Sequence, residues 1–308
     1  MLTVAFASYN GADTLPLMLD ALTRVRVPPG GWRLIAVDNA STDDTYDLLL
    51  SYRDRLPLTV LQQPARGKSK ALNLALQHLE GDLLVLTDDD VIPEPDWLEA
   101  WRRYADEHPE FGVFGGHIQP YWLQQPPDWL TSAIPIGIAY AMTKPGLQAG
   151  EVDPRYIAGP NMAVRVAAIE QGLCYDESMG PCGKRYAMGE DTAFAYAARN
   201  CGYAAGHCPA AVVRHIVQPE QYSKQWLMQR AFRYGQARGL EDALLDNNSA
   251  ATHWLGMPRW MLKERFKQEL LAVSHLLTGN RAAHLDSAWE AQFLRGYLRE
   301  YRLQVAVR

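Results

Sequence analysis

The chain has 308 residues, of which 48% are hydrophobic and 21% charged, and its formal net charge at pH 7 is −5. This is the composition of an ordinary globular protein, and the mildly negative charge argues against a nucleic acid as partner. The N-terminus has no basic leader, and no stretch reaches about 18 uncharged apolar residues, so we expect a cytoplasmic protein without a membrane span.

The first part of the chain alternates segments of strand and helix character. Buried strands are predicted at residues 2–8, 32–37, 58–62 and 83–87, with helical segments between them. This alternation predicts an α/β fold with a mainly parallel, Rossmann-like sheet flanked by helices. Ligands collect at the carboxyl ends of the strands in such sheets. We therefore expect one crevice lined by Tyr9, Asn10, Asp38, Arg66, Lys68 and the acids Asp88, Asp89 and Asp90.

Three consecutive acids follow the apolar run at 83–86 and its closing threonine. If the backbone stays extended, the side chains of Asp88 and Asp90 point the same way and Asp89 points to the other side. A pair of carboxylates suits Mg²⁺ or Mn²⁺, ions that keep several waters and commonly bridge to the phosphates of a substrate. The alternative is a solvated acidic turn, since Pro93 and Pro95 follow at once.

Five motifs occur in a fixed order: Ala-Ser-Tyr-Asn-Gly at 7–11, Val-Asp-Asn-Ala-Ser-Thr-Asp at 37–43, Arg-Gly-Lys-x-x-Ala-Leu-Asn at 66–73, Thr-Asp-Asp-Asp at 87–90 and Gly-Glu-Asp at 189–191. Together they resemble the motifs of the family 2 glycosyltransferases, which have the GT-A fold. The resemblance implies a GT-A nucleotide-sugar-binding and catalytic domain at residues 1–218 and a C-terminal helical region at 219–308. The family moves a sugar from a nucleotide diphosphate donor to an acceptor, usually with inversion at the anomeric carbon.

The resemblance also implies the nucleotide-binding residues, namely Ser8, Tyr9, Asn10, Asp38, Arg66, Lys68, Asp88 and Asp89. In this arrangement Tyr9 flanks the base and Asp38 accepts its ring N–H. The two basic residues lie near the base or phosphate, and Asp88 or Asp89 lies near the ribose. The first motif begins with Ala7 and Ser8 where many members have Pro-x, so the base-binding strand end departs from the family pattern.

A metal site and a general base follow from the same resemblance. Asp90 is expected to hold Mn²⁺ or Mg²⁺, with Asp88 and His215 as further candidate ligands, and a packed or solvated histidine is the alternative for His215. Asp191 is expected to take the proton from the acceptor hydroxyl, and Glu190 to support the acceptor. Because this acidic pair opens a predicted helix, an N-cap role is its alternative.

Residues 111–165 are expected to form the donor-sugar and acceptor side of the site. Gly159 and Asn161 resemble the Gly-x-Asn strand that lies beside the donor sugar in the family. A glycine there allows the backbone to approach closely. Trp122 belongs to an aromatic segment whose faces suit sugar rings or lipid headgroups, and a packed cover is the alternative.

The C-terminal part differs in charge from the rest of the chain. Residues 221–308 carry 13 Lys or Arg and 8 Asp or Glu, a net charge of +5. Helices are predicted from residue 222, at 258–277 and at 283–303. Three interpretations fit residues 220–308: peripheral binding to an anionic membrane on its cytoplasmic face, packing within the fold, or formation of a homodimer.

The sequence therefore predicts a metal-dependent, inverting glycosyltransferase acting in glycan or cell-surface polysaccharide synthesis. The preferred donor is a UDP-sugar, because Asp38 suits a pyrimidine imide, with GDP and dTDP donors as alternatives; the acceptor is a hydroxyl of a carbohydrate or a lipid-linked glycan. One rival is a sugar-phosphate nucleotidyltransferase, and another is a catalytically silent protein that binds sugar or a lipid surface. The glycine-rich fingerprints of dinucleotide oxidoreductases and P-loop NTPases are absent from the sequence.

Overall fold

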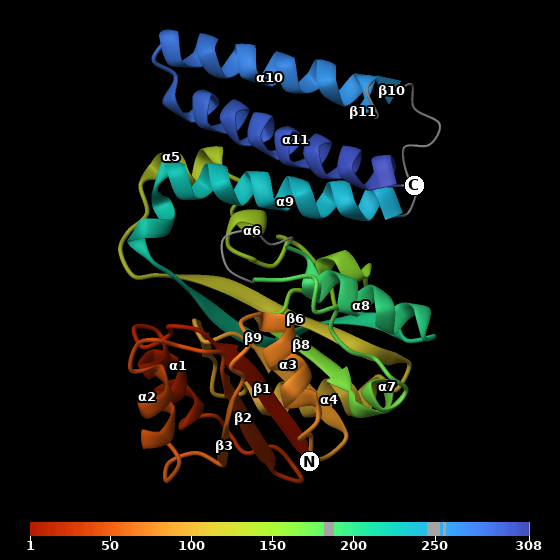
Figure 1. Cartoon of the computed structure of the whole chain (residues 1–308). Coiled ribbons are helices and arrows are strands. Elements are labelled where there is room, and N and C mark those ends of the chain that lie inside the picture. Colours follow the sequence, from red (N-terminus) through yellow and green to blue (C-terminus); the bar gives the residue numbers. More distant parts are fainter. Residues whose placement is uncertain (182–187, 245–252, 255–256, 308) are drawn as a thin grey trace. The chain divides into compact units, whose positions relative to one another are not determined.

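The computed structural model describes residues 1–181, 188–244, 253–254 and 257–307 of the chain (Figure 1). The chain divides into two compact units, each of which has its own core. The first unit comprises residues 1–121, 141–185 and 190–216, and the second comprises 122–140, 186–189 and 217–308. Segment 122–140 therefore belongs with the C-terminal helices, whereas the sequence-based division at residue 218 places it in the first domain.

Four parallel strands form one half of the sheet of the first unit. Its order is β3-β2-β1-β4, made of β1 (Leu2–Ser8), β2 (Trp32–Asp38), β3 (Leu58–Gln62) and β4 (Leu83–Thr87). All five residues of β4 are buried, as the continuous apolar pattern predicts for a strand covered on both faces. The carboxyl ends of these strands, with their polar loops, meet at one edge of the sheet.

Helices cover both faces of this sheet. Alternate residues of β1 point to opposite sides, so Val4 and Phe6 join one core while Ala5 joins the other. The first core is completed by α1 (Leu15–Leu22), α2 (Thr45–Ser51) and α4 (Trp97–Glu107). The second is completed by α3 (Lys68–Leu76), α7 (Val166–Glu170) and α8 (Glu190–Asn200). The predicted α/β fold with a sheet between helical layers is confirmed.

The other strands extend the sheet beyond β4 in the order β8-β6-β9-β5, and β7 pairs with β9. They are β5 (Val91–Pro93), β6 (Phe111–Trp122), β7 (Gly150–Glu151), β8 (Asn161–Arg165) and β9 (Ala204–Val217). The pairs β4–β8, β6–β8, β5–β9 and β7–β9 are antiparallel, so parallel pairing belongs to the strands that alternate with helices. Because β9 continues to Val217, His215 lies within this strand, opposite Val91 of β5.

Asn161 at the start of β8 is fully buried and braces three parts of the sheet. Its Oδ1 accepts a hydrogen bond from Trp97 Nε1 at 2.8 Å. Its Nδ2 donates to the carbonyls of His117 at 3.1 Å and Ala211 at 2.8 Å. Because the Asn161 amide is buried and makes three hydrogen bonds within the fold, we do not retain it among the donor-sugar contacts.

We expect Asn161→Ala to lower the free energy of unfolding by about 3 kcal/mol, because it leaves a buried indole N–H and two carbonyls without their partner. Urea unfolding followed by circular dichroism measures this loss. Asn200→Ala, at an exposed position of α8, is the matched control and should change stability by less than about 0.5 kcal/mol. Equal stabilities of the two variants would contradict the bracing role.

The second unit is helical. It contains α5 (Asp128–Ala133), α6 (Ile136–Ala139), α9 (Lys224–Leu244), α10 (Arg259–Leu277) and α11 (Arg281–Val307), with the short strands β10 (His253–Trp254) and β11 (Met257–Pro258). Helices α9 and α11 approach closely, since a Cβ at Gly235 or Gly239 would overlap the backbone of Phe293 or Tyr297. Among the described residues, no helix has the length and apolar character needed to cross a membrane. Residues 245–252, 255–256 and 308 of the predicted C-terminal region lie outside the described part.

Candidate active site

A pocket of about 510 Å³ lies at the carboxyl ends of β1 and β4 and at the start of α3. It brings together residues predicted from three separate motifs: Ser8, Tyr9, Arg66, Lys68, Asp88, Asp89 and Asp90. Asp38 ends the neighbouring strand β2 and pairs in register with Ser8. The predicted convergence of polar loops at one edge of the sheet is therefore seen in the first unit.

An aromatic ring and a guanidinium form the exposed side of this pocket. The Tyr9 ring is 41% exposed, and the Arg66 guanidinium carbon lies 3.7 Å from its centroid. Asp38 is buried, and its Oδ1 accepts a hydrogen bond from the backbone N–H of Ser41 at 3.2 Å. A flat stacked pair beside a buried carboxylate is chemically suited to a planar heterocycle with an N–H.

Two asparagines hold the surrounding loops. Asn10 has a positive φ of 53°, and its Oδ1 accepts from the N–H of Thr42 at 2.8 Å, which ties the β1 loop to the β2 loop. Asn39 accepts from the N–H of Gly67 at 2.8 Å and donates to the carbonyls of Gln63 and Ala65. Asn39 therefore shapes the loop that carries Arg66 and Lys68, a role that sequence reasoning missed although Asn39 lies within a recognised motif.

The three acids diverge because residues 88–90 form a turn and not an extended strand end. Asp88 Oδ1 lies 2.8 Å from Lys68 Nζ. Asp89 accepts a hydrogen bond from the Ser8 hydroxyl. Asp90 Oδ2 lies 3.2 Å from His215 Nε2. The extended backbone that the expected shared direction of Asp88 and Asp90 required is not present, and each acid has its own partner on a different element.

The surrounding groups shift the pKa values of Asp89 and Asp90 in opposite directions. Burial and then the negative charge of Asp90 raise the pKa of Asp89 to about 7, although the Ser8 hydrogen bond opposes the shift. Burial also disfavours ionised Asp90, but His215 and Lys68 outweigh it and hold the pKa of Asp90 below its ordinary value. The turn therefore contains a partly buried carboxylate that stays ionised.

Asp90 has the properties of a ligand for a divalent cation. Its Oδ1 is buried and has no hydrogen-bond partner within the described part of the chain. A buried, ionised oxygen beside an imidazole fits a Mg²⁺ or Mn²⁺ site in which substrate phosphates and water supply the other ligands. The described residues contain no group of three or more His, Cys, Asp or Glu that could hold a metal by themselves. Asp88, the second predicted ligand, is paired with Lys68.

Lys68 connects the turn at residues 88–90, called here the acid turn, to the start of α8. Its Nζ lies 2.8 Å from Asp88 Oδ1, 3.6 Å from Asp191 Oδ2 and 3.7 Å from Glu190 Oε1. Burial disfavours the ammonium ion, but these three carboxylates, Asp191 first, hold the pKa of Lys68 well above its ordinary value. Lys68 is thus a permanent cation between two acidic groups that lie about a hundred residues apart in the sequence.

The carboxylate of Asp191 lies at the first turn of α8 in a nearly closed environment. Burial raises its pKa to about 7; Lys68 opposes this shift, while the negative charges of Glu190 and Asp88 support it. A Cβ at Gly159 would overlap the Asp191 carboxylate, so a glycine is needed at that position. Gly159 therefore packs against the candidate base, a contact that the sequence did not predict.

Tyr175 is a further residue of this site that the sequence did not reveal. Its hydroxyl lies 3.4 Å from Asp191 Oδ1, and its ring stacks on Phe194 with centroids 4.3 Å apart. Asn73 fixes the Tyr175 backbone by donating to its carbonyl at 3.0 Å and accepting from its N–H at 2.9 Å. The only signal in the sequence is Asn73 itself, which ends the motif at 66–73.

Trp122 belongs to the second unit, where it packs edge to face with Tyr140 and Tyr222. The centroid separations are 5.5 and 5.7 Å. This aromatic cluster agrees with the interpretation of a packed cover.

Known proteins share both the sequence pattern and the fold. The model of the family described as "Glycosyl transferase family 2" matches residues 3–172. The succinoglycan biosynthesis protein ExoM of Rhizobium meliloti is 28% identical over 224 residues, which cover 72% of this chain and 69% of that protein. The poly(ribitol-phosphate) β-N-acetylglucosaminyltransferase TarS of Staphylococcus aureus is 29% identical over 108 residues, which cover 34% of this chain but only 19% of TarS.

Two solved structures have the same fold at low sequence identity. The mannosyltransferase PcManGT from Pyrobaculum calidifontis, in complex with GDP-Man and Mn²⁺, has a TM-score of 0.62 and 21% identity over 97% of this chain and 86% of its own. Residues 1–349 of S. aureus TarS, in complex with UDP, have a TM-score of 0.52 and 19% identity over 96% of this chain and 91% of that one. With more than half of its length matched by the family model and a GT-A fold, the chain belongs to glycosyl transferase family 2 and is a glycosyltransferase.

Proposed function

We propose that this glycosyltransferase moves a sugar from a nucleotide diphosphate sugar to an acceptor hydroxyl in a single, inverting displacement with Asp191 as general base. The observation that carries the proposal is the position of Lys68 between Asp191 and the acid turn. It joins Asp191, whose pKa is raised, to Asp88 of the turn that also carries the ionised Asp90, and Oδ1 of Asp90 is buried without a hydrogen-bond partner among the described residues. All residues of this mechanism lie within 1–218, which we assign as the catalytic domain.

Asp191 is suited to proton transfer near neutral pH. A general base works best when its pKa lies near the working pH, and burial raises the pKa of Asp191 to about 7. In this mechanism its carboxylate takes the acceptor proton as the acceptor oxygen attacks the anomeric carbon and the bond to the nucleotide diphosphate breaks. Lys68 holds the carboxylate in place, and Gly159 leaves room for it. Glu190 is assigned to the acceptor side as a supporting residue.

The acid turn is assigned to the leaving group. Asp90, with His215 beside it, would hold Mn²⁺ or Mg²⁺, and the bound ion would neutralise the charge that develops on the departing diphosphate. The Mn²⁺ in the PcManGT complex supports a divalent ion in this fold. Asp88 and Asp89, in contact with Lys68 and Ser8, are assigned to the ribose side of the donor.

The exposed pair of Tyr9 and Arg66 is assigned to the base, and buried Asp38 to its ring N–H. A UDP-sugar is the preferred donor, because a uracil imide donates one hydrogen bond to such a carboxylate. The complexes of TarS with UDP and of PcManGT with GDP-Man support a nucleotide-sugar donor and differ in the base. The names of ExoM and TarS support an acceptor in cell-surface polysaccharide synthesis.

A screen of nucleotide sugars with and without Mn²⁺ or Mg²⁺ tests the proposed function. We expect metal-dependent release of a nucleotide diphosphate, fastest with a UDP-sugar. Release of pyrophosphate from a nucleoside triphosphate and a sugar phosphate would favour the rival nucleotidyltransferase. Absence of turnover with every donor would favour a silent binding protein.

Gly159→Ala tests whether the position of Asp191 matters. The added methyl group would overlap the Asp191 carboxylate and displace it, and we expect transfer to fall about a hundredfold. Binding of UDP, measured by calorimetry, should stay within about twofold of the wild-type value, because Gly159 does not line the donor pocket. Unchanged turnover would contradict the close packing of Gly159 on the base.

A further inference from the structure

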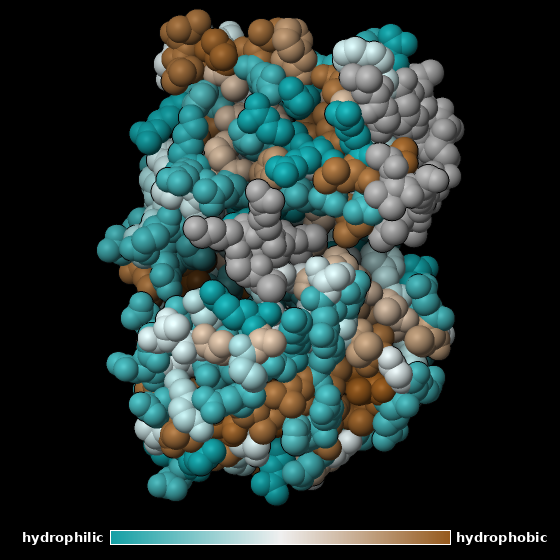
Figure 2. Space-filling view, in the orientation of Figure 1, coloured by the Kyte–Doolittle hydropathy of each residue, from teal (hydrophilic) through white to brown (hydrophobic). Residues whose placement is uncertain are grey.

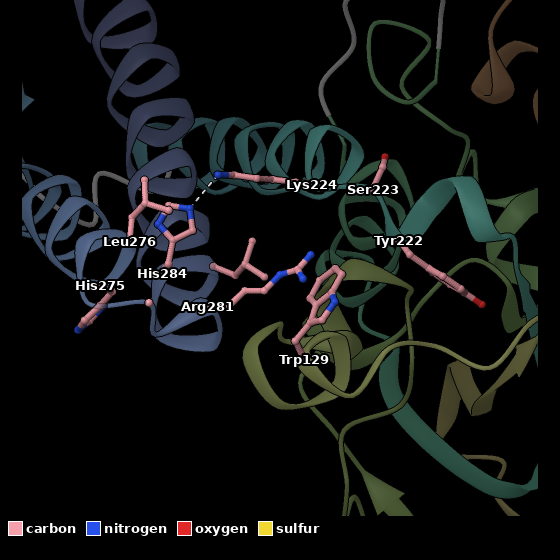
Figure 3. A pocket seen from close by; sticks show the side chains of 10 residues that line it. Trp129, Tyr222, Ser223, Lys224, His275, Leu276, Arg281 and His284 are labelled. Atoms are coloured by element: carbon pink, nitrogen blue, oxygen red, sulfur yellow. Dashed lines mark hydrogen bonds between the residues drawn. The ribbon is translucent and has the colours of Figure 1, made fainter.

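The second unit contains a pocket of its own, with a volume of about 500 Å³, which the proposed reaction does not use. Figure 3 shows the side chains that surround it. The pocket lies where the turn between α10 and α11 meets the start of α9, and Trp129 of α5 completes its wall. A cavity formed by four separate helices is a candidate binding site for a ligand of moderate size.

The polar residues of this pocket carry positive charge. Arg281 and Lys224 line it, and none of the described residues that line it is acidic. The Arg281 guanidinium carbon lies 5.4 Å from the centroid of the Trp129 ring, and Figure 3 shows these two side chains against each other. When an arginine stacks on an aromatic face, its N–H groups point outward in the plane of the guanidinium, where they can bind phosphate oxygens. The pocket is therefore chemically suited to an anion.

His284 positions Lys224 toward this site. The Nδ1 of His284 lies 2.8 Å from the Ala272 carbonyl, which can only accept, so Nδ1 carries the proton. Its Nε2 therefore accepts a hydrogen bond from Lys224 Nζ at 2.8 Å, the dashed line in Figure 3. The ammonium group uses one N–H in this contact and has two others for a ligand.

An exposed apolar face continues from the pocket along α10. Phe266, Leu270, Val273 and Leu277 lie at helical spacing on one side of α10, and their exposed fractions range from 55 to 82%. Leu276 lines the pocket and is itself 61% exposed, so the apolar face reaches the pocket. Figure 2 shows hydrophobic side chains gathered over α10.

We infer that this pocket binds the phosphate-bearing headgroup of an anionic lipid while the apolar face of α10 enters the adjoining layer of the membrane. The two basic side chains match the phosphate, and the neighbouring leucines, valine and phenylalanine match the acyl region. The net charge of +5 on residues 221–308 complements an anionic surface. A helix that cannot span a bilayer but exposes an apolar face beside basic residues is typical of interfacial binding.

Vesicle flotation at low salt tests the inference on the full chain. We expect vesicles of phosphatidylcholine with about one quarter phosphatidylglycerol to retain the wild-type protein. Vesicles of pure phosphatidylcholine should not retain it, and high salt should release it from the anionic vesicles. Combining Arg281→Gln with Lys224→Gln should weaken retention about tenfold. Combining Arg299→Gln with Arg302→Gln removes the same two charges from exposed positions about 30 Å along α11 and should have less than a threefold effect.

Further variants separate the phosphate contact from the apolar contact. Phe266→Ser with Leu277→Ser should also weaken retention about tenfold, whereas Leu303→Ser, at a 52% exposed site on α11, should not. Arg281→Lys should retain part of the binding that Arg281→Gln loses. Thermal melting and donor hydrolysis of the same variants should match the wild type, which separates this inference from the proposed reaction.

Four results would overturn the inference. The first is no retention of wild-type protein on anionic vesicles at low salt, and the second is equal retention of the Arg281→Gln/Lys224→Gln variant and the Arg299→Gln/Arg302→Gln control. The third is binding of glycerol 3-phosphate or inorganic phosphate without any binding to vesicles, and the fourth is a dimer in solution that Phe266→Ser dissociates while the protein does not bind vesicles. The third result would assign the pocket to a soluble phosphate. The fourth would assign the α10 face to a second copy of the chain.

Discussion

Asp191→Asn is expected to lower turnover at least a hundredfold while UDP binding stays within about twofold of the wild-type value. The amide keeps the shape of the side chain but cannot take a proton from the acceptor. Asp191 does not line the donor pocket, so the donor contacts remain. Glu170→Gln, at an exposed position of α7, removes the same charge and should leave both quantities unchanged.

The pH profile gives the same prediction a second readout. Because the pKa of Asp191 is raised to about 7, the wild-type enzyme should be fully active above that pH, where the base is ionised. Its kcat/KM should fall about tenfold for each unit of pH below 7, as the carboxylate becomes protonated. The residual activity of Asp191→Asn should lack this step. Full turnover by Asp191→Asn, or the same acid limb in both proteins, would remove Asp191 from the mechanism.

Asp90→Asn is expected to abolish the effect of Mn²⁺ on UDP binding and to lower kcat by about a hundredfold. The variant replaces the ionised carboxylate, whose buried Oδ1 lacks a partner among the described residues, with a neutral amide. Loss of the outer-sphere partners of a metal site lowers metal affinity about tenfold to a hundredfold. Loss of a residue that binds the ion directly, as proposed for Asp90, should lower it at least as much.

Asp88→Asn is the matched comparison for Asp90. Asp88 is paired with Lys68 at 2.8 Å, so this change should weaken activity but preserve the ratio of UDP affinities with and without Mn²⁺. Calorimetry at several Mn²⁺ concentrations measures that ratio for both variants. If Asp88→Asn loses the metal effect and Asp90→Asn keeps it, the ion is held by the other acid of the turn.

The sequence predicted the elements that depend on local pattern. Strands β1, β3 and β4 have the predicted bounds, because short apolar runs between polar loops indicate buried strands clearly. The convergence of Tyr9, Arg66, Lys68 and the acids follows from the general rule on strand ends in parallel sheets. These features needed only periodicity and topology.

The remainder depends on contacts that no local pattern encodes. Lys68 reaches Asp191 only because the folded sheet brings α3 and α8 together. Asn161 matches a motif near the donor sugar, yet burial and three hydrogen bonds commit it to the fold. Residues 88–90 form a turn in which each acid has a different partner, so the extended backbone that strand alternation requires is absent there.

Titration calorimetry of UDP into the wild-type protein, with and without Mn²⁺, tests the central claim most directly. The proposed site combines a base pocket at Tyr9, Arg66 and Asp38 with an ionised Asp90 beside His215. We predict that UDP binds and that Mn²⁺ strengthens binding at least tenfold. Absence of metal-enhanced binding with UDP, GDP and dTDP alike would contradict a metal-dependent nucleotide-sugar transferase.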